Sequence, residues 1–313
     1  MGHELLPTEL EPTIESMEEV DVTRSMQERS GRWRALAGKT LAIIALATSV
    51  SVATEATAAA SAHKFSSSPR KEKLYNSATY WAGYQVSSPN YLDYVTTDFI
   101  VPSVSCPSSG ESDVSMWAGV GTGTGTDDLY QTGVRLECTD GTESSHIWWE
   151  DYPQNSEQDY SGHTVSAGDK IVAQVLPNSG PGHNVELYVY DYGSNLSQDY
   201  PNWTLHHEIS LSSAPSASTS ECVAEQVQIG GSRADLLDFG SINFSTDTSG
   251  SPNKACNVTA NDIDHIISSS QSSLNHGLTG TALTIENSSN TTLADTSSPS
   301  SSGEFTVTWD ASN

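Results

Sequence analysis

The chain has 313 residues, of which 17% are charged, and its formal net charge is −26. From residue 77 onward, 29 Asp and Glu residues stand against only four basic ones, Arg135, Lys170, Arg233 and Lys254. This composition excludes a nucleic-acid partner, because phosphate binding needs clusters of Lys and Arg. It favours work in acid, where a Lys-rich chain would keep a large, self-repelling positive charge once its carboxylates are protonated. A halophilic surface is the alternative, but it would be denser in carboxylates.

Residues 1–62 are predicted to form an N-terminal extension with a secretory signal. Basic residues precede an apolar run at 41–52, and small residues follow at 56–62. This order is that of a cleavable signal peptide. The apolar run is short for a membrane span, so a signal anchor is the weaker interpretation. We therefore expect a secreted protein without stable membrane association, and we interpret residues 63–76 as a basic linker or short pro-segment.

Residues 77–313 are predicted to form one β-rich domain, because short runs of alternating polarity are separated by turn residues. The predicted strands are 77–84, 94–101, 114–120, 129–138, 146–153, 170–176, 185–192, 203–211, 221–229, 236–244, 283–287 and 305–309. A helix is indicated only at 261–268, and the Ser/Thr-rich runs at 212–220 and 288–302 are predicted as loops. Many short strands of this kind indicate a sandwich or a barrel.

The run 129–138 has the clearest strand alternation. One face would carry Thr132, Val134, Leu136 and Cys138, and the other would carry Gln131, Gly133, Arg135 and Glu137. The first set suits a core. The second places a Gln beside a Gly, where a ligand could approach the backbone closely. An ordinary half-exposed strand would show the same pattern, so this strand alone indicates no function.

Motifs occur before, within and after the strand predicted at 129–138. They are W-x-G at 117–119, L-x-Q-T-G-V at 129–134, W-x-E-x-Y-P at 148–153, E-x-x-x-E at 221–225 and D-F-G-S-I-N-F at 238–244. With these motifs, the chain from residue 77 onward resembles the glutamic peptidases, the eqolisin family of acid endopeptidases. The resemblance implies a lectin-like (concanavalin A-like) sandwich of two antiparallel β-sheets. It also implies a cleft on the outer, concave face of one sheet.

The resemblance implies Gln131 and Glu225 as the catalytic pair. Glu221 and Glu225 share a strand face, so alternation does not distinguish them, and the resemblance assigns the second. Glu225 would act as general base and then as acid, and the Gln131 amide would donate to the developing oxyanion. No cofactor, metal or covalent intermediate is needed. We therefore expect a monomeric, pepstatin-insensitive acid endopeptidase that acts on protein or peptide substrates.

The resemblance also implies five substrate-binding residues, namely Gly83, Trp117, Trp148, Glu150 and Tyr152. Core packing is the alternative for the tryptophans. Gly121 and His146 depart from the family, since both stand where acidic residues are expected near the catalytic pair. A cationic His146 would lower the pKa of a nearby carboxylate, so these two positions bear on the pH optimum.

The four cysteines fit an oxidising compartment. They allow three pairings, of which proximity in sequence favours Cys106–Cys138 and Cys222–Cys256. There is no C-x-x-C motif, so a zinc site is not indicated.

Two other functions remain as alternatives. One is a carbohydrate-active sandwich enzyme that uses Glu150 and Glu225 as its two carboxylates. The other is a non-catalytic lectin-like protein. Neither gives Gln131 a role, so the peptidase is the preferred interpretation.

Overall fold

The structure is a computed structural model of the chain that describes residues 80–88, 91–121, 128–179, 183–195, 201–215, 217–229, 232–244, 256–260, 263–266, 279–300 and 303–310. All of these residues belong to the second of two compact units, residues 62–313. The predicted leader and linker lie outside the described residues, so their boundaries stay predictions. Within the described ranges, no helix has the length and apolar character needed to cross a membrane.

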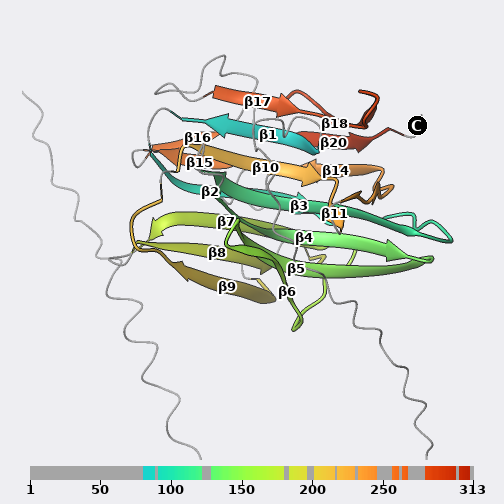
Figure 1. Cartoon of the computed structure of the whole chain (residues 1–313), viewed down its shortest axis with the longest axis horizontal. Helices are drawn as coiled ribbons and strands as arrows, with labels where there is room; N and C mark the ends of the chain where they lie inside the picture. Colours follow the sequence, from blue (N-terminus) through green and yellow to red (C-terminus); the bar gives the residue numbers. More distant parts are fainter. Residues whose placement is uncertain are drawn as a thin grey trace, which may run out of the picture. The chain divides into compact units, whose positions relative to one another are not determined.

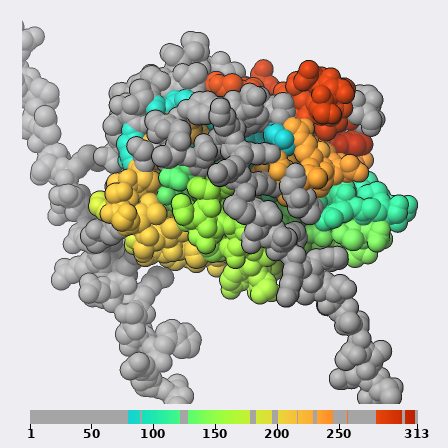
Figure 2. Space-filling model, in the orientation of Figure 1, coloured from blue at the N-terminus to red at the C-terminus, as the bar shows by residue number. Residues whose placement is uncertain are grey.

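The described residues form two β-sheets (Figure 1). The first has the order β17 (Thr279–Leu283), β1 (Trp81–Ser87), β10 (Thr219–Glu225), β3 (Glu111–Gly121), β4 (Leu129–Thr139), β5 (Thr142–Tyr152) and β6 (Asn155–Tyr160). All these neighbours pair antiparallel, and the short β13 (Asp235–Leu236) pairs parallel with β3. On the surface, residues 279–300 (red) and the lime-green residues of β5 and β6 mark opposite edges of the face seen in Figure 2.

The second sheet has the order β18 (Ile285–Glu286), β19 (Thr292–Thr296), β20 (Phe305–Trp309), β14 (Ser241–Phe244), β2 (Leu92–Ile100), β7 (Lys170–Ser179), β8 (Asn184–Asp191) and β9 (Trp203–Ser210). In addition, β15 (Asn257–Ala260) pairs with β2 and with β16 (Ile263–Ile266). A separate hairpin joins β11 (Gln228–Ile229) to β12 (Ser232–Arg233).

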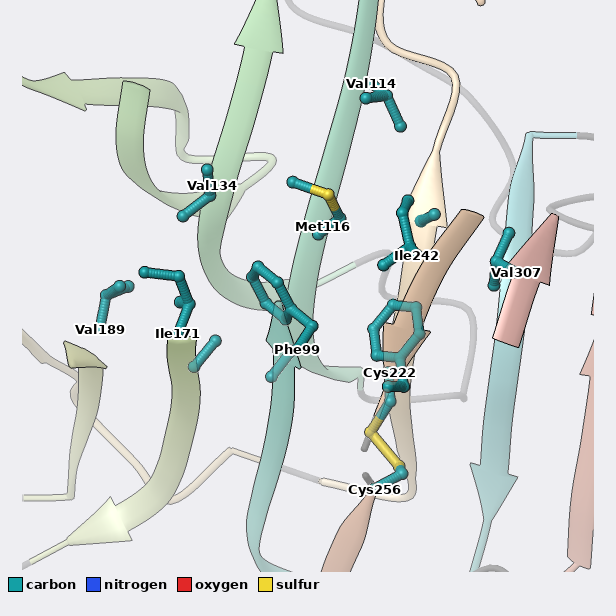
Figure 3. Packing of buried hydrophobic residues seen from close by; sticks show 14 of the residues in the cluster. Phe99, Val114, Met116, Val134, Ile171, Val189, Cys222, Ile242, Cys256 and Val307 are labelled. Atoms are coloured by element: carbon teal, nitrogen blue, oxygen red, sulfur yellow. A yellow bond between two sulfur atoms is a disulfide. The ribbon is translucent and has the colours of Figure 1, made fainter. Parts of the chain in front are cut away.

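The core lies between the two sheets. From the first sheet, Met116 and Val134 point inward, and from the second, Phe99, Ile171 and Val189 meet them (Figure 3). All five side chains are at most 1% exposed. Inward positions alternate along each strand, as expected for a sandwich whose inner faces pack together. The predicted all-β sandwich of two antiparallel sheets is therefore confirmed.

Both favoured disulfides are present. Cys106–Cys138 ties the segment before β3 to the end of β4, with its Cα atoms 5.4 Å apart. Cys222–Cys256 joins β10 of the first sheet to the residue before β15 of the second, with its Cα atoms 5.8 Å apart (Figure 3). The second bridge therefore links the two sheets covalently, on the inner side of β10.

Four of the predicted elements are wrong in part. The helix expected at 261–268 contains strand β16, and the loop expected at 288–302 contains β19. The predicted strand 221–229 is broken after Glu225, and 236–244 is a strand only at Leu236, the end of β13, and from Ser241 onward. Strand β6 was not predicted at all. The strand state of β6, β16 and β19 comes from backbone pairing with a neighbouring strand, a tertiary contribution that overrides local propensity.

Candidate active site

The outer face of the first sheet carries a row of residues aligned by strand pairing. Antiparallel register places Gln85 opposite Glu221, Glu221 opposite Gly119, Gly119 opposite Gln131, and Gln131 opposite Glu150. We call these five residues the Gln131 row. Four strands thus contribute polar side chains to this row, and Gln131 of β4 and Glu221 of β10 lie on either side of the single glycine, Gly119.

A second row forms an apolar layer along the same face. Trp117 pairs with Val223 on one side and with Gly133 on the other, and Gly133 pairs with Trp148. These side chains belong to a cluster separate from the main core, the tryptophan floor, made of Trp81, Trp117, Leu129, Trp148, Val223 and Leu283. Trp117 and Trp148 are 0% and 1% exposed. Both tryptophans lie on the face that was predicted to bind substrate, but their side chains are buried and support that face from below.

Two glycines allow this packing. A Cβ at Gly119 would lie 2.6 Å from Cζ3 of Trp117, so the indole ring occupies the space that a side chain would need. Gly83 has a φ of +136°, and a Cβ there would lie 2.3 Å from the carbonyl oxygen of Cys222. Only glycine tolerates both that conformation and that approach. Gly83, predicted to bind substrate, therefore lets β1 pack closely on β10.

Glu225 belongs to a third row. It lies opposite Trp81 and Ser115, and its Oε2 accepts a hydrogen bond of 2.8 Å from Trp117 Nε1. Four residues of strand separate it from Glu221, which is about 13 Å along β10. The row of Trp117 therefore lies between Glu225 and the Gln131 row, whereas Glu221 is level with Gln131.

Glu221 is a buried carboxyl group, with 2% of the residue exposed. Its Oε1 accepts a hydrogen bond of 3.0 Å from Gln85 Nε2, and Thr219 also hydrogen-bonds to it through its side chain. Its Oε2 is buried without a hydrogen-bond partner. Burial raises the pKa of Glu221 to about 7, against the opposite effect of the Gln85 and Thr219 hydrogen bonds. The group is therefore a carboxylic acid in acid solution.

Gln131 is 5% exposed, and its side chain has a defined orientation. Its Nε2 donates to Oε2 of Glu150 at 2.5 Å, while its Oε1 is buried without a hydrogen-bond partner. An amide nitrogen carries two hydrogens, so one remains for a further acceptor. Glu150 thus lies beside Gln131, and its role in binding substrate stays a prediction. Tyr152 is half-buried against the tryptophan floor, one pair further along β5.

His146 lies at the other end of the face, in an ionic cluster around Arg135. Arg135 is buried and pairs with Glu157, with Asp159 at 3.2 Å and with Glu137 at 3.7 Å. His146 lies 3.4 Å from Asp159 and 3.7 Å from Glu137. Its pKa is lowered, first by burial and then by Arg135, against the opposing carboxylates. The carboxylates that a protonated His146 would act on are therefore those of this cluster.

Sequence reasoning missed three residues of this face. Gln85 and Thr219 contact Glu221, and Asp113 is fully buried on β3 beside Glu137. Burial and then Glu137 raise the pKa of Asp113 to about 7, while Arg135 opposes them. Strand parity places Asp113 on the same side of β3 as Trp117, and this was the available signal. No motif pointed to Gln85 or Thr219, since their role depends on pairing across strands.

The comparisons with known proteins agree with this fold. The model of the Peptidase A4 family matches residues 79–309. The chain belongs to the peptidase A4 family. This confirms the predicted membership of the glutamic peptidases. Aspergillopepsin-2 of Aspergillus niger is 28% identical over 182 residues, which are 52% of this chain and 61% of that protein. The matched stretch thus spans less than two thirds of the relative's length.

Two solved structures show the same architecture. Scytalido-glutamic peptidase, in complex with a transition state analog inhibitor, has a TM-score of 0.55 at 20% identity, covering 74% of this chain and 98% of that one. SCP-B, a member of the eqolisin family in complex with the tripeptide Ala-Ile-His, has a TM-score of 0.53 at 19% identity, with the same coverage. At these identities the likeness establishes the fold of this peptidase A4 family member.

The ionisation of Glu221 and Asp113 should lower the stability of the folded domain as pH rises. Both have folded pKa values near 7, above about 4 for the unfolded chain. Their stabilising contribution is therefore complete below about pH 4 and is lost progressively up to about pH 7, at roughly 1.4 kcal/mol per unit of pKa difference. Urea unfolding from pH 3 to 8 measures this loss. Glu221→Gln and Asp113→Asn should each flatten it, and unchanged slopes in both variants would contradict the assignment.

Proposed function

We propose that this chain is a secreted acid endopeptidase that hydrolyses peptide bonds with Gln131 and a glutamate of β10. The observation that carries the proposal is the register of the Gln131 row. It aligns an amide and a buried carboxyl group on either side of Gly119, each with one buried oxygen that lacks a hydrogen-bond partner. A scissile peptide group between them would meet a proton donor and an amide N–H together.

The register favours Glu221 over Glu225 as the partner of Gln131. The resemblance in sequence pointed to Glu225, but that residue is displaced from Gln131 by four residues along β10 as well as by two strand spacings. Its carboxylate is also engaged by the Trp117 indole. We therefore propose Glu221 as the catalytic carboxyl group, with Glu225 orienting Trp117.

The order of proton transfers follows from the ionisation of Glu221. In acid it is protonated, so it can give its proton to the carbonyl oxygen while water adds to the carbon. The carboxylate that results then takes the proton that the water loses. When the tetrahedral intermediate collapses, the same group protonates the leaving amine and accepts the proton of the gem-diol hydroxyl. The second hydrogen of Gln131 Nε2 can stabilise the oxygen on which charge develops.

The geometry argues against the carbohydrate-active alternative. That reaction needs two carboxyl groups about 5–9.5 Å apart. Glu150 on β5 and Glu225 on β10 have β4 and β3 between them, so their strands are about 14 Å apart. They also belong to different rows. Glu150 is instead the hydrogen-bond acceptor of Gln131.

The purified protein should cleave denatured casein at pH 2–5, and the cleavage should resist pepstatin, serine-protease reagents and EDTA. The proposed pair needs neither an aspartic dyad, nor a nucleophilic serine, nor a metal. Activity should fall as pH rises through about 7, because Glu221 then loses its proton. Inhibition by EDTA, or activity on a polysaccharide panel in place of casein, would contradict the proposal.

Glu221→Gln and Gln131→Ala should each lower kcat on a quenched fluorescent peptide by at least about 10²-fold, since each removes a partner of the same step. The double variant should be hardly worse than either single one. Glu225→Gln is the matched control, because its amide oxygen can still accept from Trp117. Circular dichroism checks folding. An inactive Glu225→Gln beside an active Glu221→Gln would restore the assignment made from the sequence.

The mature protein should begin between Ala59 and Ser77, with all four cysteines oxidised. The signal-like leader motivates the first expectation, and the two disulfides motivate the second. N-terminal sequencing and thiol titration of material from the culture medium measure both. A secreted protein that retains Leu41, or one with four free thiols, would count against secretion through a cleaved signal.

A further inference from the structure

Arg135 lies on the same outer face of β4 as Gln131, four residues further along the strand. The position between them on this face is Gly133, where a Cβ would lie 2.6 Å from Cβ of Trp117, so no side chain separates the two. Arg135 is only 4% exposed, although its guanidinium is permanently charged. A buried charge is tolerated only when it is paired, so the partners of Arg135 show which segments it holds together.

Two of these partners belong to the edge strand β6. Nη1 of Arg135 pairs with Glu157, and Nη2 pairs with Asp159 at 3.2 Å and with Glu137 of β4 itself at 3.7 Å. Because β5 lies between β4 and β6, the side chain of Arg135 reaches across β5 to meet Glu157 and Asp159. The planar guanidinium presents its donors in fixed directions. Arg135 therefore ties β6 to β4.

The pairing of β5 with β6 is interrupted opposite Glu150. The ladder is regular up to Trp149 and resumes only at Asp151, and over this step two residues of β6, one of them Glu157, face a single residue of β5. We call this irregularity the β6 bulge. Bulges re-aim side chains and are frequent next to active sites. Because the ladder does not hold Glu150 here, its place depends on how the bulge is fixed, and the Arg135–Glu157 pair fixes it.

Glu150 is in turn the acceptor that orients Gln131. Gln131 Nε2 donates to Glu150 Oε2 at 2.5 Å, while the amide oxygen is buried without a hydrogen-bond partner. A carboxylate can only accept, so it holds the amide nitrogen, and not the amide oxygen, toward β5. A displacement of Glu150 would therefore turn or shift the amide. A series of neighbours thus runs from Arg135 through Glu157 and Glu150 to Gln131.

We propose that Arg135 is a positioning residue for peptide hydrolysis, which fixes the β6 bulge through Glu157 and so keeps Glu150 and the Gln131 amide in place. The proposal rests on the part of the proposed function that gives Gln131 a role in the reaction. It does not depend on which glutamate of β10 acts with Gln131. Since Arg135 is buried, it acts through its neighbours, and its loss should affect the chemical step more than substrate binding.

The test compares two variants of the ion pair with a matched control. Arg135→Gln and Glu157→Gln should each lower kcat on a quenched fluorescent peptide about tenfold with little change in KM, because a misplacement of about 1 Å can cost about 10²-fold. The double variant should be hardly worse than either single one, since both break the same contact. Glu137→Gln is the control, because Glu137 also pairs with Arg135 but lies on β4, outside the β6 bulge. It should keep the kcat of the wild type.

A second measurement separates positioning from a general loss of folded protein. In a Gln131→Ala background, where the amide is already missing, Arg135→Gln and Glu157→Gln should have no further effect on the residual kcat. A merely structural role would lower it again. Urea unfolding of each variant shows how much of the protein is folded in the assay. All rates are measured at about pH 5, above the ordinary pKa of Asp and Glu side chains.

Three results would overturn the inference. They are a wild-type kcat in both Arg135→Gln and Glu157→Gln, an equal loss in Glu137→Gln, and a further loss of similar size in the Gln131→Ala background. If Gln131→Ala is strongly impaired while both ion-pair variants behave as wild type, only this inference fails. If Gln131→Ala is fully active, the proposed function fails and takes this inference with it. Glu157→Gln keeps the shape of the side chain, so the test stays decisive if Arg135→Gln does not fold.

Discussion

The pairing of β3 with β10 on one side and with β4 on the other is the constraint on which the candidate site depends. Gln131 and Glu221 are 90 positions apart in the chain, and each meets Gly119 in the sheet. A shift of one residue in either pairing would turn one of the two side chains into the core. The extensive ladder of β3 and β4, from Glu111 to Gly121, opposes such a shift along its whole length.

The same strands serve two layers at once. Inward-facing residues such as Met116 and Val134 build the sandwich core, while Trp117 and Trp148 build the tryptophan floor on the opposite side. Because both sides of β3 and β4 are packed, the polar residues of the Gln131 row stand on a rigid support. The Cys222–Cys256 bridge adds a covalent tie immediately next to Glu221. Such support is what a catalytic pair needs to keep its geometry.

The proposed activity in acid is compatible with the buried carboxyl groups of this domain. Glu221 and Asp113 are both protonated below neutral pH, so neither introduces an uncompensated buried charge there. At higher pH each must either ionise while buried or hold its proton at a cost. Arg135, one of the few basic residues, forms ion pairs with Glu137, Glu157 and Asp159. Glu221, by contrast, accepts a hydrogen bond from a neutral donor, Gln85.

The sequence by itself determined the fold class, most of the long strands and the family, and it favoured the disulfide pairing that the structure shows. Alternating polarity and turn residues are local signals, and the motifs around Gln131 and Trp148 are contiguous. The tertiary structure decided what depends on pairing between distant segments. It showed that β16 and β19 are strands, that Gln85 and Thr219 contact Glu221, and that Glu221 rather than Glu225 is level with Gln131. Two glutamates on one strand face have the same parity, so only the register with a neighbouring strand distinguishes their positions.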